Sequence, residues 1–208
     1  MSLQEVLIDE LRDLYSAENQ LVKALPKAIR GISDPTMKAN VKEHLEQTKG
    51  QVLRLREVFQ QLGKKPTGQH CSGMEGCIKE VTEALEKDEE GALKDAGILG
   101  ASLRVEHYEI AGYTASIAIA KVLKQKEIVD LLTETLNEEK NAAKNVLSGA
   151  PAILKQAASQ EDEDEDEDEK PKSPKEKETE QKSEQDEQEA APEMEGSSES
   201  TGKKPSSR

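Results

Sequence analysis

The sequence predicts an all-α protein, an antiparallel bundle of four long helices with a shorter helix in the second connection and a disordered acidic tail. Two observations predict this fold class. In residues 1–150, apolar side chains recur at steps of three and four, and the alternation typical of strands is missing. The 208 residues include no Trp and one Phe, so the core is expected to be aliphatic, as suits a helical bundle.

The charge of the chain divides it into two parts. Residues 157–208 contain 19 acidic and 8 basic side chains, and so carry −11 of the total of −14. Their few apolar side chains cannot offset an ordering cost of roughly 1–2 kcal/mol per residue. We therefore expect residues 1–156 to form one helical domain and residues 157–208 to be a disordered, low-complexity acidic tail.

The first two long helices have clear start and stop signals. The first opens on a capping box at residues 2–5 and runs to about residue 30, with a kink or a loosened last turn expected at Pro26. The second is expected to begin after Asp34, with Pro35 as its first residue. It ends before the glycine- and lysine-containing segment 63–68.

The remaining helices follow from the same signals. A capping box at residues 72–75 opens the shorter helix. The third long helix carries an apolar seam from Ala96 to Ile117, and the fourth carries one from Ile128 to Val146 and is expected to end at Pro151. Because each stripe is too narrow to be buried alone, the four long helices are expected to share one core.

Carboxylates interrupt the apolar stripes. Glu18 and Glu106 each occupy a position where the spacing predicts an apolar side chain, and an unpaired buried carboxylate requires a cation or a hydrogen-bonding network. Glu46 lies beside the seam of the second helix, and Glu138 and Glu139 lie on the fourth. Carboxylates that converge from four helices bind metal in di-iron and di-manganese proteins. The alternative is that these side chains are solvated or paired with lysine.

Several motifs resemble those of the YciE/YciF-type ferritin-like stress proteins of bacteria. These motifs lie within residues 3–148: DLYSAENQL at 13–21, HLEQT at 44–48 followed by GQ at 50–51, MEG at 74–76, VEHYEIA at 105–111, ETL at 134–136 and EEK at 138–140. The resemblance implies a ferritin-like bundle, a homodimer, a dinuclear iron or manganese site and a link to stress responses. If the protein is an enzyme, the activity implied is that of a peroxide- or dioxygen-reacting, catalase-like oxidoreductase.

The resemblance also implies the site residues. It makes Glu18, Glu46 and Glu106 the expected metal ligands, followed by Glu138. The helix positions themselves add His107, Glu109 and Glu139 as reserve ligands, with Tyr113 and Lys49 beside the site. The alternatives are a core or interface imidazole for His107 and a buried structural tyrosine for Tyr113. The ferritin-like pattern Glu-x-x-His is incomplete, because Glu46 is followed three residues later by Lys49 and Glu138 by Asn141. A pair between Lys49 and Glu46 would suit a competing hypothesis, a metal-free structural or interaction bundle without catalytic activity. His44 is expected to be exposed or interfacial.

Other features concern location and partners. The N-terminal residues do not form a secretory signal, and no stretch approaches the roughly 18 apolar residues of a membrane helix, so we expect a cytoplasmic protein without a membrane partner. Cys71 and Cys77 are expected to be reduced thiols. The acidic run 161–169 repels nucleic acid. The tail is expected either to aid solubility or to bind basic proteins or divalent cations.

Overall fold

The computed structural model describes the backbone of residues 1–67 and 69–168 and the side chains as far as residue 160, with residue 68 again left out. Within these residues the chain forms helices and no strand, as predicted. The helices are α1 (Leu3–Gly31), α2 (Pro35–Gln61), α3 (Ser72–Glu86), α4 (Gly91–Val122) and α5 (Lys126–Asp168). None of the described helices is both long enough and apolar enough to span a membrane.

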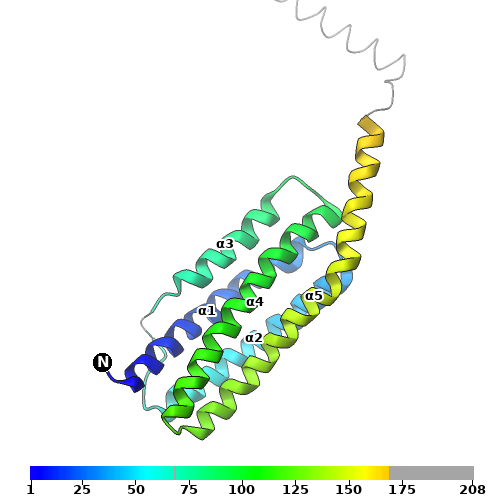
Figure 1. Ribbon diagram of the computed structural model, residues 1–208. Coiled ribbons are helices and arrows are strands. Elements are labelled where there is room, and N and C mark those ends of the chain that lie inside the picture. The colour runs from blue at the N-terminus through cyan, green and yellow to red at the C-terminus, as the bar shows by residue number, and fades with distance from the viewer. Residues whose placement is uncertain (68, 169–208) are drawn as a thin grey trace, which may run out of the picture. The chain divides into compact units, whose positions relative to one another are not determined.

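Residues 1–164 form one compact unit. In it α1, α2, α4 and α5 run alongside one another as a bundle, and α3 packs on the outside against α1 and α4 (Figure 1). Short connections join α1 to α2 and α4 to α5, so the helices of each pair run in opposite directions. The predicted antiparallel bundle with an extra helix in the second connection is thus confirmed.

Two of the predicted helix starts are confirmed and one differs in detail. The side chain of Ser2 and the backbone of Glu5 form the expected capping box, and Asp34 accepts a hydrogen bond of 2.7 Å from the backbone N–H of Met37 at the start of α2. The start of α3 uses no serine cap. Instead, the thiol of the buried Cys71 accepts a hydrogen bond of 3.3 Å from the backbone N–H of Met74.

The predicted end of the last helix at Pro151 is wrong. Helix α5 continues through this proline to Asp168, so residues 157–168 are helical where a disordered tail was expected. The physical reason is a continued apolar stripe, since Ile153 and Ala157 are buried and Ile153 packs in a cluster with Ile32 and Ile98. The rest of the expected tail, residues 169–208, lies outside the described residues.

The core consists of apolar clusters separated by a polar layer. One cluster combines side chains from the start of α1, the end of α2, the end of α4 and the start of α5, among them Leu11, Phe59, Ile117 and Leu132. At the other end of the bundle a second cluster surrounds Ile98. Along each of the four long helices, a stretch with buried polar side chains lies between these two clusters.

Candidate metal centre

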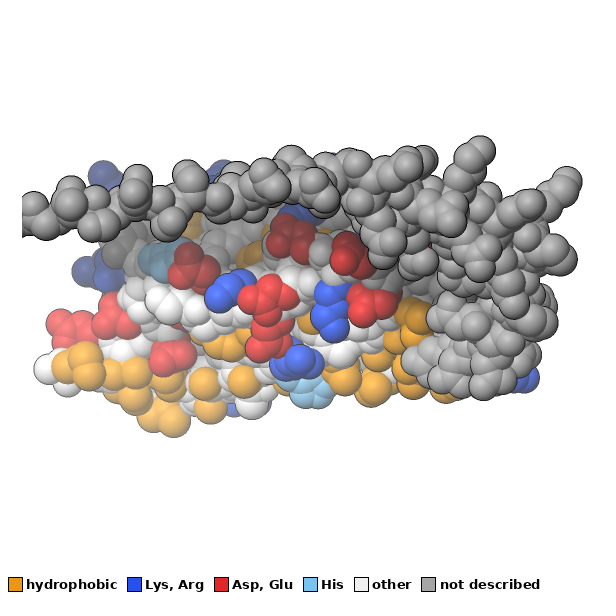
Figure 2. All heavy atoms as spheres, turned by 90° about the horizontal axis from the view of Figure 1, so that it is seen from above, with side chains coloured by type: hydrophobic (Ala, Val, Ile, Leu, Met, Phe, Trp, Pro, Cys, Tyr) orange, Lys and Arg blue, Asp and Glu red, His pale blue; other side chains and the backbone are white. Residues whose placement is uncertain are grey.

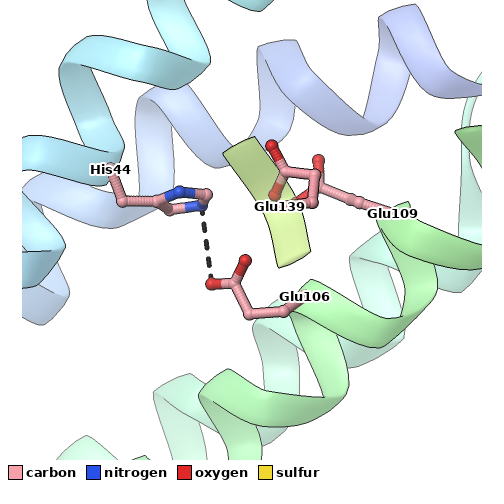
Figure 3. Close-up of side chains that lie close together, drawn as sticks. All are labelled: His44, Glu106, Glu109 and Glu139. Atoms are coloured by element: carbon pink, nitrogen blue, oxygen red, sulfur yellow. Dashed lines mark ion pairs between the residues drawn. The ribbon is translucent and has the colours of Figure 1, made fainter. Parts of the chain in front are cut away.

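Five buried titratable side chains meet in this polar layer, and they are called here the mid-bundle group: Glu18 of α1, His44 of α2, Glu106 and Glu109 of α4, and Glu139 of α5. Each is at most 6% exposed. One potential ligand atom from each of His44, Glu106, Glu109 and Glu139 lies within 4.8 Å of the others. Figure 3 shows the imidazole facing Glu106, with the carboxylates of Glu109 and Glu139 beside them.

Few hydrogen bonds satisfy the mid-bundle group. Tyr113 donates a hydrogen bond to Oε1 of Glu18, and the amide of Gln51 donates one to Oε1 of Glu139. No donor among the described residues outside the group reaches seven of the other ligand atoms, all of which are buried: one oxygen each of Glu18, Glu106 and Glu139, both oxygens of Glu109 and both ring nitrogens of His44. Within the group, Glu139 can share hydrogen bonds with Glu106 and Glu109 only where one carboxyl of the pair keeps a proton. Buried polar atoms are normally paired, so this concentration of unpaired acceptors requires an explanation.

Burial shifts the pKa of every member of the group. Burial first, and then the neighbouring carboxylate charges, raise the pKa values of Glu18, Glu106 and Glu109 well above the ordinary value. Burial likewise raises the pKa of Glu139 to about 7. It lowers the pKa of His44 to about 4, which keeps the imidazole neutral at neutral pH. In the absence of a cation, the folded protein therefore favours protonated carboxyls and an uncharged histidine.

A second polar layer links α2 to α5 next to the group. Arg54 donates hydrogen bonds of 3.0 and 3.1 Å to Glu138 and one of 2.6 Å to Glu134. Gln51 spans both layers, because its amide also donates to Oε2 of Glu138 at 3.0 Å. The guanidinium thus neutralises carboxylates at the edge of the bundle, while those of the mid-bundle group make no salt bridge to Lys or Arg among the described residues.

The structure brings some of the predicted ligands together and leaves others outside. Glu18 and Glu106 are in the mid-bundle group, and so are Glu109 and Glu139, which were predicted in reserve. Glu46 is not, because its side chain is 70% exposed and pairs with Lys49 at 2.6 Å. The Glu138 carboxylate is held by Arg54 instead.

Two further predictions concern histidines. His107 is exposed, and its Nδ1 lies 2.9 Å from the carbonyl oxygen of Leu103 on its own helix, so it does not face the group. His44 was expected at an exposed or interfacial position, and this is wrong, since it is buried within the group. A signal was present, because His44 precedes Thr48 by one helical turn and Thr48 lies on the predicted seam of α2.

Helix geometry explains the misplaced ligands. The buried polar face of α2 carries His44, Thr48 and Gln51. Glu46 follows His44 by two residues and therefore points about 200° away on a helix. If the pattern Glu-x-x-His lay on this buried face of α2, Thr48 would stand where its glutamate is expected and Gln51 where its histidine is expected.

On the buried face of α5, Glu139 stands where the glutamate of Glu-x-x-His is expected and Ala142 where the histidine is expected, and both residues are buried. Glu138 is rotated from Glu139 by about 100°, which turns it toward Arg54. The side chains of Glu46 and Glu138 therefore lie on helix faces that point away from the mid-bundle group.

The donor set of the group fits a dinuclear site for hard divalent cations. Four carboxylates and one imidazole supply oxygen and nitrogen ligands of the kind that manganese and iron accept. The unpaired buried atoms provide free lone pairs, and helices on all sides hold them in place. Tyr113 and Gln51 fix two of the carboxylates by hydrogen bonds, as outer groups commonly do for metal ligands.

Comparison with known proteins places this bundle in a family. A model of the family described as a domain of unknown function, DUF892, matches residues 2–159. Protein YciF of Escherichia coli strain K12 is 39% identical over 140 residues, which make up 67% of this chain and 84% of YciF. The crystal structure of that E. coli stress protein is similar with a TM-score of 0.72 and 35% identity, covering 74% of this chain and 98% of YciF.

Other solved structures support the same fold. YcfI from Rhodopseudomonas palustris has a TM-score of 0.68 at 41% identity, covering 70% of this chain and 93% of its own. Ferritin-like, diiron-carboxylate proteins from Bacillus anthracis reach 0.56 at 19% identity, covering 72% and 99%, and show the ferritin-like fold alone. The chain therefore belongs to the DUF892 family, which confirms the resemblance to YciF-type ferritin-like stress proteins seen in its motifs.

Proposed function

We propose that the mid-bundle group binds two iron or manganese ions and that the protein is a dinuclear metal carboxylate protein of the bacterial stress response that reacts with peroxide or dioxygen. The observation that carries this proposal is the set of buried ligand atoms without a hydrogen-bond partner. In a metal-free polar layer, only carboxyls that keep a proton can pair these oxygens with one another, and both ring nitrogens of His44 still lack a partner among the described residues.

Charge balance supports two ions rather than one. If all four carboxyls of the group ionise, they carry four negative charges at sites where burial strongly disfavours charge. Two divalent cations neutralise four carboxylates. Binding then reverses the pKa shifts, because a nearby cation favours the ionised form of each carboxyl.

Each member of the group has a distinct part in this proposal. Oxygen atoms of Glu18, Glu106, Glu109 and Glu139 and a ring nitrogen of His44 would hold the ions. When bound, the two ions supply Lewis acidity and redox equivalents for the reduction of peroxide or dioxygen. Tyr113 and Gln51 orient the carboxylates of α1 and α5 and limit their rotation.

The second candidate is a metal-free structural or interaction bundle. It is favoured by Thr48, Gln51 and Ala142, which take places where the Glu-x-x-His pattern would provide ligands. The pair between Lys49 and Glu46, which this hypothesis predicted, is present but exposed. An exposed pair contributes little to stability and does not neutralise the buried carboxylates.

Elemental analysis combined with a peroxide assay tests the proposal. The full-length protein is purified without chelator, reconstituted anaerobically with Fe²⁺ or Mn²⁺, and assayed for metal content and for peroxide consumption. We expect two ions per chain and a rate proportional to metal content. Protein without metal that takes up none on reconstitution would support the metal-free bundle. Two bound ions without peroxide or dioxygen consumption would contradict the reaction and leave the metal site standing.

We propose further that the protein is cytoplasmic and that it is a homodimer, the latter as its resemblance to the family implies. Exposed apolar side chains are consistent with a second copy covering part of the surface. Leu53 of α2, Val122 of α4 and Leu147 of α5 are 61%, 70% and 52% exposed, and Figure 2 shows hydrophobic side chains gathered along one edge of the face in view. Binding of basic proteins or divalent cations by the acidic tail stays a prediction, because residues 169–208 lie outside the described part.

A further inference from the structure

A cavity of about 390 Å³ lies in the half of the bundle that contains the connection from α1 to α2. All five helices contribute apolar side chains to its wall, including Leu25, Val41, Val81, Leu99 and Val146. These five side chains are only partly buried. Protein interiors are normally packed without voids of this size, and the volume lies within the range of small-molecule pockets.

The polar residues of the cavity wall differ between its two ends. The inner end reaches His44 and Glu106 of the mid-bundle group. The outer end includes Lys23 and Lys27, both exposed on α1. Lys27 pairs with Glu86 at 2.7 Å, whereas Lys23 makes no salt bridge within the described part of the chain. Two acidic side chains also line the cavity, and both accept hydrogen bonds from neighbouring residues: Asp34 from the backbone N–H of Met37, and Glu43 from the amide of Gln47. A molecule in this cavity therefore meets an apolar wall, the ammonium group of Lys23, which has no salt-bridge partner within the described part of the chain, and the buried carboxyl of Glu106.

We propose that this cavity binds a single-chain aliphatic carboxylate, with its alkyl chain along the apolar wall and its head group at Lys23. The reverse orientation would place the anionic head at the buried base of the cavity, beside His44 and Glu106, where burial disfavours a charge and no cation is available among the described residues. The chain end then lies next to His44. Binding requires no metal, whereas the idea that the chain end meets a reactive centre rests on the proposed function.

Two other occupants fit the cavity less well. Residues 169–208 contain no Leu, Ile, Val or Phe, so they offer no side chain that would fill an aliphatic cavity. A second copy of the chain would have to insert a protruding apolar segment between helices, and its presence would show as a change in oligomeric state when the cavity is filled.

Binding to a series of fatty acids tests the proposal. The full-length protein, stripped of metal by chelation, is titrated calorimetrically with hexanoate, octanoate and decanoate. We expect the affinity to rise about fourfold with each added CH₂, as burial of a methylene implies. Affinity that is independent of chain length would overturn the proposal. Because the protein in this experiment is metal-free, the result for decanoate binding does not depend on whether the mid-bundle group binds metal.

Substitutions locate the bound chain. Val41→Trp is expected to fill the cavity and abolish decanoate binding, and Ala24→Trp does the same from α1 in case the first variant fails to fold. Lys42→Trp, at an exposed position of α2 outside the cavity wall, is the matched control and should bind as the wild type does. Wild-type affinity in both cavity variants, or a change of oligomeric state in them alone, would contradict the proposal.

Further variants place the head group. Lys23→Gln is expected to weaken decanoate binding while leaving decanol unaffected, and Lys42→Gln, which is outside the cavity wall, serves as the control. Equal losses for decanoate and decanol in Lys23→Gln would contradict the proposed orientation.

Discussion

Nε2 of His44 on α2 lies 3.6 Å from Oε1 of Glu106 on α4, and neither ring nitrogen has a hydrogen-bond partner among the described residues. Burial lowers the pKa of this histidine to about 4, so the two side chains do not form an ion pair at neutral pH. A neutral imidazole is the form that binds metal. The pair thus joins two helices of the bundle through atoms that are free to coordinate a cation.

Loss of the buried histidine should weaken metal binding. His44→Ala removes the one nitrogen donor of the mid-bundle group, and we expect the affinity for Mn²⁺ to fall by at least about tenfold, as is typical when the support of a metal site is removed. Calorimetric titration of the chelated protein measures this change. His107→Ala is the matched control, because that histidine is exposed and faces away. Equal affinities in the two variants would exclude His44 as a ligand.

The stability of the metal-free protein should depend on pH in an unusual direction. Below pH 4.5, the ordinary pKa of a glutamate, the Glu139 carboxyl is protonated in both the folded and the unfolded protein. Because its pKa in the folded protein is about 7, the folded protein keeps this proton between pH 4.5 and 7, whereas the unfolded protein loses it. The folded state then binds more protons than the unfolded state, so stability falls as pH rises through this range. For Glu139 alone, the loss by pH 8 amounts to about 3 kcal/mol.

His44 acts in the opposite sense over nearly the same pH range. Its pKa falls from 6.5 to about 4 on folding, so its contribution rises with pH between these values and is complete near neutrality. Urea unfolding of chelated wild-type and Glu139→Gln protein between pH 4.5 and 7 separates the two effects, because His44 is present in both proteins. The wild type should lose roughly 2–3 kcal/mol of stability relative to the variant over this range, and at pH 7 added Mn²⁺ should remove the loss. A difference in stability between the two proteins that stays constant from pH 4.5 to 7 would contradict the placement of the Glu139 carboxyl.

Neutralising one carboxyl of the group should have opposite effects on stability and on metal binding. At pH 8, Glu139→Gln removes a buried charge and is expected to stabilise the metal-free protein by about 1–3 kcal/mol. The same variant should bind metal more weakly. Glu138→Gln is the control, since it loses a partly exposed pair with Arg54 worth less than about 1 kcal/mol and leaves metal affinity unchanged. Unfolding curves and metal titrations of both variants separate these outcomes.

The sequence predicted the fold well because its apolar spacing and its caps agree. The stripes of α1 and α4 predicted the burial of Glu18 and Glu106 from apolar neighbours on both sides. In α2 the polar residues Thr48 and Gln51 interrupt the apolar pattern, so the spacing did not define which of His44 and Glu46 faces inward. Pro151 was read as a helix end because the burial of Ile153 depends on long-range packing that local signals do not contain.

Moving the pattern Glu-x-x-His from one face of α2 to the other should show which face lies at the mid-bundle group. Lys49→His completes Glu-x-x-His on the exposed face, so we expect no gain in metal affinity. Thr48→Glu combined with Gln51→His completes the same pattern on the buried face, and we expect the affinity for Fe²⁺ or Mn²⁺ to rise by at least about tenfold. Anaerobic titration of both variants measures the difference. A gain in Lys49→His alone would instead place the site on the outer face.

The most direct test of a dinuclear site is the number of ions that the buried carboxylates bind. Chelated full-length protein is titrated with Mn²⁺ at pH 7 by calorimetry, in parallel with the double variant Glu106→Gln/Glu139→Gln. We predict saturation at two ions per chain for the wild type and no saturable binding for the variant. No saturable binding in the wild type, or the same two ions in the double variant, would contradict metal binding by the mid-bundle group.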